Sequence, residues 1–295
     1  MEPVLDITDD ERRCGSISPE KLDHCRDLLD EHGYLVLPNA VSSAPLEKLN
    51  DFLNDEWAAF NQSKDKWIGG GRHIGHVQLM PPATPEYLLK EALLNDIFFQ
   101  ITSHILGPDV VNVVYSGNTN LPGSTNQHFH SDTEPVGMES LIINIPLIDV
   151  DESNGSLELI AGSHKQPHSF RSIEAMEMQG HGIRINSAIG DAVIRYPTLL
   201  HRGAANPSSM PRHMLSMWHA PRGTSVEVMT PPFPVAPACK DMIGDGVERQ
   251  KCHFEERRLN TFCPNYFAPN VAGLIKEMAF LHTPGLFSLV KRMQR

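Results

Sequence analysis

Long runs of basic residues are missing from this 295-residue chain, in which lysine and arginine form no run longer than an adjacent pair and the formal net charge is −11. Nucleic-acid binding depends on neutralising phosphates with such residues, so a nucleic-acid partner is not expected. The same shortage disfavours tight binding to anionic membranes. No window approaches the roughly 18 continuous apolar residues of a membrane span. The composition, 40% hydrophobic and 21% charged, indicates an ordinary globular protein.

Cysteine pairs at metal-binding or redox spacing are missing too. The cysteines are odd in number and scattered, with no C-x-x-C: Cys14, Cys25, Cys239, Cys252 and Cys263. This pattern favours reduced thiols in a cytoplasmic protein over a disulfide framework. The N-terminal stretch MEPVLDITDDERRCG lacks the basic-then-apolar order of a signal peptide, and the final KRMQR is not a peroxisomal signal. Cytoplasmic location is therefore expected.

The N-terminal part predicts helices that cover a sheet. Ser18 followed by Pro19 is a typical helix start, and apolar residues then recur at helical spacing until Gly33 ends the helix. The further elements expected here are a strand at 34–38 and helices from about Pro45 and over 95–106.

Beyond residue 108 the pattern changes to short β-branched runs separated by glycine, asparagine and proline. The runs are VVNVVY, SLIINIPL, GSLELI, HGIRI, DAVIRY and RHMLSMWH. Such runs at this spacing predict an antiparallel sandwich or barrel. We expect one core domain over residues 1–222.

Two further segments lie outside these elements. WIGGGRHIGH (67–76) is either a surface loop or a loop that lends Arg72 to a pocket. After Gly223 a proline-rich stretch precedes a helical pattern with Asn270 as a plausible cap. We expect 223–295 to be a C-terminal extension that packs on the core or on a second subunit, which would suit a homodimer.

The polar stretch NQHFHSD (126–132) carries the chemistry. It places His128, His130 and Asp132 at every second position, so a strand would present all three side chains to one face. Later in the chain, a strand that ends near Tyr196 leads to His201.

Two histidines and one carboxylate form the facial triad of non-haem Fe(II) oxygenases, which leaves the opposite face of the metal open. Arg212 follows His201 by eleven residues, and an arginine fork binds a carboxylate through two hydrogen bonds. An open iron beside such a clamp suits a 2-oxo acid cosubstrate.

The chain resembles the phytanoyl-CoA dioxygenase (PhyH) family of Fe(II)/2-oxoglutarate-dependent oxygenases, and in particular the branch that acts on specialised metabolites. The matching pieces, across roughly residues 22–222, are GYLVLPNAV, QHFHSD, NGSLELIAGSH and GDAVIRYPTLLH, followed by Arg212. The resemblance implies an α+β fold: a double-stranded β-helix (a jelly-roll, cupin-like barrel) flanked by N-terminal helices, with the C-terminal helical extension added.

The resemblance also implies roles for individual residues. His130, Asp132 and His201 would be the iron ligands, and Arg212 would pair with the distal carboxylate of 2-oxoglutarate. Gln127 and Arg72 would help to hold that cosubstrate. From their place on the strand before the motif, we further expect Tyr115 and Asn118 to line the substrate pocket.

Some positions depart from the family pattern. His128 is an additional histidine, which we expect to support the ligands from behind or to pack in the core. Gly203 replaces a hydroxyl residue that some members use on the cosubstrate, and Pro167 stands where relatives offer threonine. Asp132 is the carboxylate that halogenating relatives lack, so hydroxylation, desaturation or oxidative rearrangement is favoured over halogenation.

The sequence therefore predicts an enzyme that uses Fe(II), 2-oxoglutarate and O2 to oxidise an unactivated C–H bond of a small molecule. Three alternatives stay open: an acyl-CoA hydroxylase of the same family, a cupin-like isomerase or hydrolase with another divalent metal, and a non-catalytic binding protein. Oxygen uptake that depends on 2-oxoglutarate separates the last two from an oxygenase. Because a chain of net charge −11 is less suited to a CoA phosphate site, a specialised metabolite such as a terpenoid or alkaloid is the preferred substrate class.

Overall fold

The fold is described from a computed structural model, in residues 3–61, 74–77, 81, 84, 86–133, 140–222 and 224. Arg72 and the expected C-terminal extension, apart from Thr224, lie outside this part of the chain. The helices are α1 (Asp9–Cys14), α2 (Pro19–His32), α3 (Ser43–Asn61), α4 (Lys90–Leu93), α5 (Asp96–Leu106), α6 (Phe170–Met178) and a 3-10 turn at Ser163–Lys165. The strands are β1 (Tyr34–Leu37), β2 (His76–Val77), β3 (Val110–Asn120), β4 (Leu141–Pro146), β5 (Leu157–Leu159), β6 (Ile183–Ile185), β7 (Ala192–Arg195), β8 (His201–Gly203) and β9 (Arg212–Pro221).

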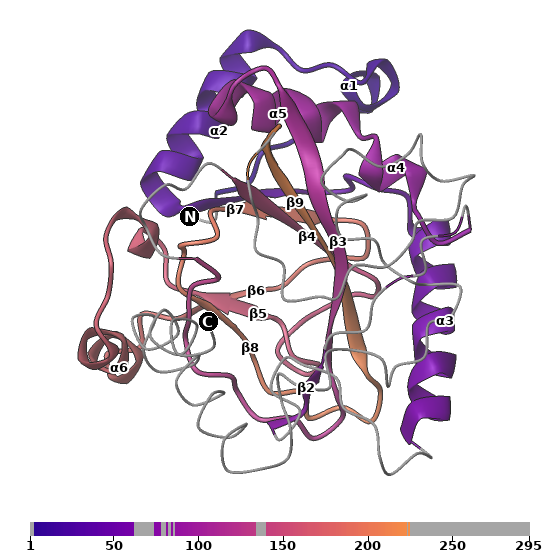
Figure 1. The fold of residues 1–295 in the computed structure, drawn as a ribbon, viewed down its shortest axis with the longest axis vertical. Helices are drawn as coiled ribbons and strands as arrows, with labels where there is room; N and C mark the ends of the chain where they lie inside the picture. The colour runs from indigo at the N-terminus through magenta and orange to yellow at the C-terminus, as the bar shows by residue number, and fades with distance from the viewer. Residues whose placement is uncertain are drawn as a thin grey trace, which may run out of the picture.

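Two antiparallel sheets face each other (Figure 1). The larger has the strand order β1-β7-β4-β9-β3-β2, and the smaller has the order β6-β5-β8. Residues 127–130 extend the smaller sheet beyond β8, because the Gln127 amide donates to the Gly203 carbonyl at 3.0 Å and His130 forms a bridge with His201. This α+β architecture of antiparallel sheets with flanking helices agrees with the fold class expected from the sequence.

The helix boundaries follow from their caps. Ser18 Oγ accepts the Lys21 amide at the start of α2, and Gly33 ends the helix with a left-handed φ of 84°. In α5, Asn95 Oδ1 accepts the amides of Ile97 and Phe98, the second and third residues of the helix. The short helices α1 and α6 were not anticipated, although Thr8 and Ser169 cap them with side-chain oxygens in the usual way.

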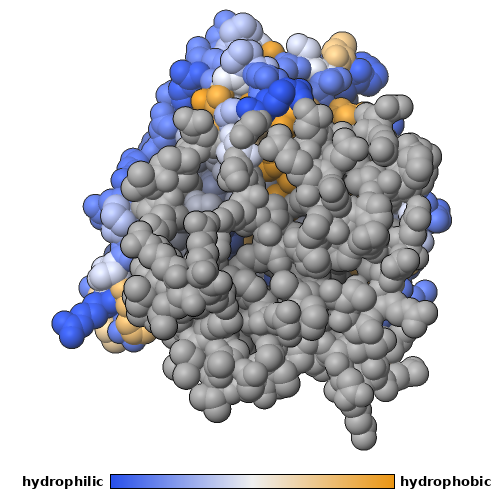
Figure 2. Space-filling view, in the orientation of Figure 1, coloured by the Kyte–Doolittle hydropathy of each residue, from blue (hydrophilic) through white to orange (hydrophobic). Residues whose placement is uncertain are grey.

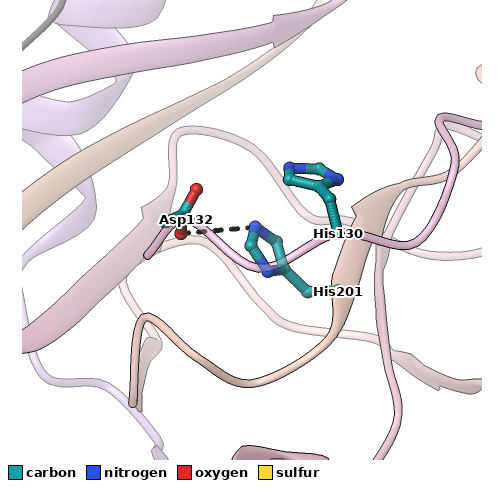
Figure 3. Close-up of side chains that lie close together, drawn as sticks. All are labelled: His130, Asp132 and His201. Atoms are coloured by element: carbon teal, nitrogen blue, oxygen red, sulfur yellow. Dashed lines mark ion pairs between the residues drawn. The ribbon is translucent and has the colours of Figure 1, made fainter. Parts of the chain in front are cut away.

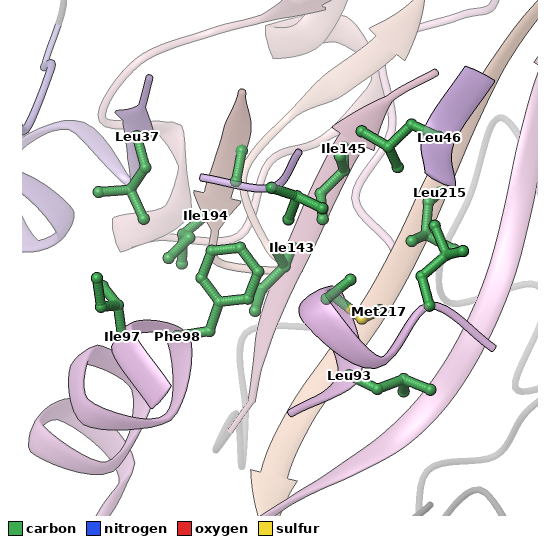
Figure 4. Packing of buried hydrophobic residues seen from close by; sticks show 14 of the residues in the cluster. Leu37, Leu46, Leu93, Ile97, Phe98, Ile143, Ile145, Ile194, Leu215 and Met217 are labelled. Carbon is green, nitrogen blue, oxygen red and sulfur yellow. The ribbon is translucent and has the colours of Figure 1, made fainter. Parts of the chain in front are cut away.

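The main core lies between the larger sheet and helices α2, α3 and α5. Alternate strand residues such as Ile143, Ile194 and Met217 point to the helices and join one buried cluster with Leu46 and Phe98 (Figure 4). The opposite side of these helices is polar, and Figure 2 shows a largely hydrophilic surface in the region of α1 and α2. One face of the larger sheet therefore packs in the hydrophobic core, and the other face is available to form a functional site.

The space between the two sheets has an apolar part and a polar part. Tyr34 and Val193 of the larger sheet meet Leu157, Leu159 and Ile185 of the smaller one. Other inward-facing positions of the larger sheet carry polar side chains, among them Asn144, Arg195 and Ser216.

A cluster of charges covers the outer face of the smaller sheet. Arg202, the residue after His201, pairs with Glu158 at 2.9 Å and with Glu177 of α6. Its guanidinium carbon lies 4.2 Å from the centre of the Phe129 ring. These contacts attach α6 to the two segments that carry the H-x-D motif and His201.

No helix within the described part of the chain is both long and apolar enough to cross a membrane.

Replacing Leu46 with alanine tests how α3 is attached to the sheet. Leu46 is 0% exposed, so Leu46→Ala should lower the free energy of unfolding by about 2–5 kcal/mol, through lost burial and the cavity left behind. Urea denaturation measures this, with Met178→Ala as the control because Met178 is 82% exposed. Equal stabilities of the two variants would contradict the assignment of Leu46 to the core.

Candidate metal centre

Three side chains from two segments converge between the sheets. One ligand atom of each of His130, Asp132 and His201 lies within 4.8 Å of the others (Figure 3). The histidine ring centres are 4.5 Å apart. His201 is buried, whereas His130 and Asp132 are partly open. The group is thus accessible from one side.

Main-chain hydrogen bonds set the distance between the two segments. His130 and His201 exchange a pair of them, at 3.0 and 2.9 Å, and the Asp132 amide donates to the Pro197 carbonyl at 2.8 Å. The residue before β8 is fixed as well, because Ser163 Oγ accepts the Leu200 amide at 2.9 Å. The positions of the three side chains therefore follow from the backbone.

Each histidine has its ring orientation set by a carbonyl two residues earlier. His130 Nδ1 lies 2.9 Å from the His128 carbonyl, and His201 Nδ1 lies 3.0 Å from that of Leu199. A carbonyl only accepts, so each Nδ1 carries the proton and donates. Nε2 of both rings is then the free lone pair, which is how metal-binding histidines are commonly arranged.

The charge state also suits a divalent metal. Burial, reinforced by the cation of Arg195, lowers the pKa of His201 to about 3, so its imidazole is neutral near pH 7. For Asp132, burial acts to raise the pKa, but His201, Arg195 and His130 together lower it to about 2. Two imidazole nitrogens and one carboxylate are a donor set for divalent first-row metals such as Fe(II). The residues present therefore fit the group that the sequence implies.

A second cation, Arg212, is buried at the start of β9. Its Nε donates to the Gly155 carbonyl at 2.9 Å, while no described residue accepts from its two terminal amino groups. Burial lowers its pKa to about 10, with Arg184 adding to the effect, so it keeps its charge at neutral pH. Gly155 has a φ of +90°, and a Cβ there would lie 3.0 Å from the Ala204 carbonyl oxygen, which explains the glycine in the NGSLELIAGSH stretch.

Gln127 lies beside the histidine strand. Its Oε1 accepts the Gly203 amide at 2.7 Å, two residues after His201. A Cβ on Gly203 would lie 2.8 Å from the imidazole of His76 and 3.0 Å from Asn120 Oδ1. Any side chain at this position, including the hydroxyl residue that the family resemblance implies, would therefore collide with His76.

The sequence of this site region has a family match. The sequence model described as Phytanoyl-CoA dioxygenase (PhyH) matches residues 29–214, more than half of the chain. The chain belongs to the phytanoyl-CoA dioxygenase family. The match spans all three candidate ligands and Arg212, and it confirms the resemblance drawn from the motifs.

Solved structures with this fold include three at low sequence identity. EvdMO1 is 19% identical with a TM-score of 0.54, and the match covers 68% of this chain but only 50% of that one. AviO1 from Streptomyces viridochromogenes Tue57 is 18% identical with a TM-score of 0.55, covering 71% and 99% of the two chains. The epimerase SnoN, in complex with Fe3+, alpha ketoglutarate and nogalamycin RO, is 14% identical with a TM-score of 0.55, covering 69% and 85%. At these identities the likeness concerns the fold.

Two expectations about the surroundings of this PhyH-family site need correction. Tyr115 lies on the helix-covered face of β3, where its hydroxyl donates to the Tyr87 carbonyl at 2.8 Å and accepts the Leu89 amide at 3.1 Å. It therefore points away from the candidate ligands. His128 is exposed and does not join the converging group, because residues 127–132 are not one regular strand.

Asn118 is three positions from Tyr115 and so lies on the opposite, inward face of β3, where it is half-buried. It stays a candidate for lining the substrate pocket.

Two buried residues near the ligands were not anticipated. Arg195 NH2 lies 2.9 Å from Asp132 Oδ2, and the sequence signal was an arginine within the otherwise apolar run DAVIRY. His76 donates from Nε2 to the Thr125 carbonyl at 2.7 Å. Burial lowers its pKa to about 4, with smaller contributions from Arg212 and His130. It was noticed only as part of a polar loop.

Removing one ligand should abolish strong metal binding. His201→Ala is expected to weaken anaerobic Co(II) binding by more than about 100-fold, beyond the effect of losing a hydrogen-bonding partner of a ligand. The visible d–d absorption of Co(II) measures it, and His24→Ala, at an exposed position of α2, is the matched control. Equal affinities of the two variants would rule out this centre.

The contact between Gly203 and His76 predicts a coupled pair of substitutions. Gly203→Ala should lower the free energy of unfolding by about 1–3 kcal/mol, because the added methyl group overpacks the site. The double variant Gly203→Ala with His76→Ala should lose less than the sum of the single losses. A double-mutant cycle from urea denaturation measures this, and strict additivity would contradict the contact.

Proposed function

We propose that the protein is an Fe(II)- and 2-oxoglutarate-dependent dioxygenase that oxidises an unactivated C–H bond of a small organic molecule, in the biosynthesis of a specialised metabolite. The proposal rests chiefly on one observation. His130, Asp132 and His201 converge, with Asp132 ionised and His201 neutral as Fe(II) binding requires, within a chain of the phytanoyl-CoA dioxygenase family, whose cofactors are Fe(II), 2-oxoglutarate and O2.

The three ligand side chains would hold the metal through the two Nε2 atoms and the carboxylate. When bound, iron supplies the oxidising chemistry: O2 and 2-oxoglutarate are consumed, succinate and CO2 are released, and one oxygen atom is left for the substrate. The chain contributes the positions of the ligands, and burial keeps the imidazole of His201 neutral. His130 donates to the His128 carbonyl and His201 donates to the Leu199 carbonyl, and these hydrogen bonds fix the orientation of both rings.

Arg212 would bind the distal carboxylate of 2-oxoglutarate. Its Nε is held by the Gly155 carbonyl, so the terminal amino groups have a defined direction. A buried guanidinium is strongly stabilised by a carboxylate partner. Gln127, beside Gly203, and Arg72 would add further contacts to the cosubstrate.

The substrate would lie against the inward face of the larger sheet, with Asn118 among its contacts. Hydroxylation, desaturation and rearrangement all begin with the same C–H attack, and a fold neighbour described as an epimerase supports a range of outcomes on one scaffold. Acyl-CoA hydroxylation is the second candidate, supported by the family description. The net charge of −11 disfavours it. A homodimer through the C-terminal extension, and a division into a core at 1–222 and an extension at 223–295, stay proposals.

The cosubstrate site is tested by an anaerobic titration of the Fe(II)-loaded protein with 2-oxoglutarate. Chelation gives a weak visible charge-transfer band. Arg212→Ala should raise the apparent Kd for 2-oxoglutarate by about tenfold or more, since a hydrogen bond to a charged group contributes roughly 1.5–3 kcal/mol.

The control is Arg222→Ala, an exposed arginine paired with Asp109 at the other end of β9. Intact Co(II) binding by Arg212→Ala would show that the metal centre is still folded. A metal-loaded wild-type protein with no band at any 2-oxoglutarate concentration would overturn the proposed function and favour a metal-dependent isomerase or a binding protein.

A further inference from the structure

His76 is a buried histidine that the proposed chemistry does not use, although it lies in the wall of the proposed cosubstrate site. The pairing of β2 with β3, and of β3 with β9, places His76 directly opposite Asn120 and Asn120 directly opposite Arg212. Directly paired residues project from the same face of a sheet, with Cβ atoms about 5 Å apart. The three side chains therefore form one row, which ends at the arginine proposed to bind the distal carboxylate of 2-oxoglutarate.

This row faces the smaller sheet at Gly203. A Cβ on Gly203 would lie 2.8 Å from Nδ1 of His76 and 3.0 Å from Oδ1 of Asn120, so both atoms approach one point beside β8. Both side chains are buried. The imidazole thus fills the space that a hydroxyl side chain at position 203, implied by the family resemblance, would need.

Asn120 presents an acceptor to His76. Its Nδ2 donates to the Ala204 carbonyl at 2.7 Å and to the Gly155 carbonyl at 3.3 Å, so both amide hydrogens are used and Oδ1 is left toward the imidazole. The Gly155 carbonyl also accepts from Nε of Arg212. Because carbonyls cannot donate, they fix the orientation of the Asn120 amide.

A neutral His76 cannot satisfy both of its oxygen neighbours. Its Nε2 donates to the Thr125 carbonyl at 2.7 Å, so the neutral ring carries its single proton there and leaves a lone pair on Nδ1. That lone pair faces Oδ1 of Asn120, which also accepts. A second proton, on Nδ1, would turn this contact into a hydrogen bond, and for that reason Asn120 acts to raise the pKa of His76.

Burial and charge keep the second proton off the ring in the free protein. Burial lowers the pKa of His76 to about 4, and Arg212 and His130 add to the effect. Among the described residues these two are the charged or titratable groups that act on it, and its hydrogen-bonding neighbours Asn120 and Thr125 carry no charge. A carboxylate bound to Arg212 would offset the repulsion from that arginine and would attract a proton to His76.

We propose that His76 is a second cationic partner of the distal carboxylate, so that 2-oxoglutarate binds together with one proton from solvent, which converts the imidazole to an imidazolium. The inference rests on the proposed function. The imidazolium donates from Nε2 to the Thr125 carbonyl and from Nδ1 to Oδ1 of Asn120, so no acceptor is left facing another. Its charge adds to that of Arg212 and replaces the hydrogen bond that a hydroxyl at position 203 would give.

The coupling gives the cosubstrate affinity a pH dependence of defined sign. Because the pKa of His76 is higher in the complex than in the free protein, binding is strongest below the pKa of the complex and weakens as the pH rises through it. One coupled proton changes the Kd by at most about tenfold per pH unit. A merely structural role of His76 would instead affect the Kd equally at every pH.

The test is anaerobic calorimetry of the Co(II)-loaded protein in buffers of different ionisation enthalpy, which counts the protons taken up with each ligand. At about pH 6.5, 2-oxoglutarate should bind with uptake of about one proton. The matched ligand is 2-oxovalerate, which has the same chelating end and a methyl group in place of the distal carboxylate. It should bind with no proton uptake.

The matched variant is His76→Gln, because glutamine keeps a donor for the Thr125 carbonyl but takes up no proton. Near pH 6.5 it should bind 2-oxoglutarate roughly tenfold more weakly than the wild type, the effect of about one pKa unit of coupling. The two Kd values should converge as the pH is raised, since His76 is then neutral in the wild type as well. His24→Gln, at an exposed position of α2, is the control and should behave as wild type.

If His76→Gln does not fold, the comparison of the two ligands on the wild type still decides. Equal proton uptake with 2-oxoglutarate and 2-oxovalerate, or none with either, would overturn the proposal, as would a loss of affinity in His76→Gln that is the same at every pH. Failure of the proposed function has a different result, because the wild-type Fe(II) protein itself would then show no 2-oxoglutarate band.

Discussion

The two main-chain hydrogen bonds between His130 and His201 are the constraint on which the site depends. They bring together segments that are 71 positions apart in the sequence. The backbone alone therefore sets the side of the strand from which both imidazoles project. Asp132 follows from the same arrangement, since its amide is held by the Pro197 carbonyl in the turn that leads to His201. The ligand geometry is thus a property of backbone pairing, which tolerates change in the surrounding side chains.

Along the strands of the larger sheet, side chains that pack in the hydrophobic core alternate with polar side chains that face the candidate site. Ile143, Ile194 and Met217 face the helices, while Asn144, Arg195 and Ser216, one position before or after them, face the interior. An apolar layer on one side allows polar groups on the other to be buried without loss of the fold, provided that they bond to one another. The inner polar side chains meet this condition from Ser216 through Asn144 to Arg195, which forms an ion pair with Asp132.

Much of this arrangement was predictable because its signals are local. Helix caps, β-branched runs and the H-x-D spacing each depend on a few neighbouring residues, and the later histidine and arginine complete a recognisable order. Tyr115 was assigned wrongly for a reason present in the sequence: Tyr115 and Asn118 are an odd number of positions apart, so one strand cannot turn both to the same side. The roles of Arg195 and His76 were not predictable, because their partners Asp132 and Gly203 are distant in sequence and only the fold brings them together.

The close approach of His76 to Gly203 has an evolutionary consequence. Neither residue can change freely, because a side chain at 203 needs the space that the imidazole fills, and a smaller residue at 76 would leave a void beside the histidine strand. Related proteins should therefore divide into two lineages, one pairing a bulky residue with glycine and the other pairing a small residue with a hydroxyl side chain. A substitution at either position on its own would be a rare intermediate, and the two positions should covary in an alignment of the family.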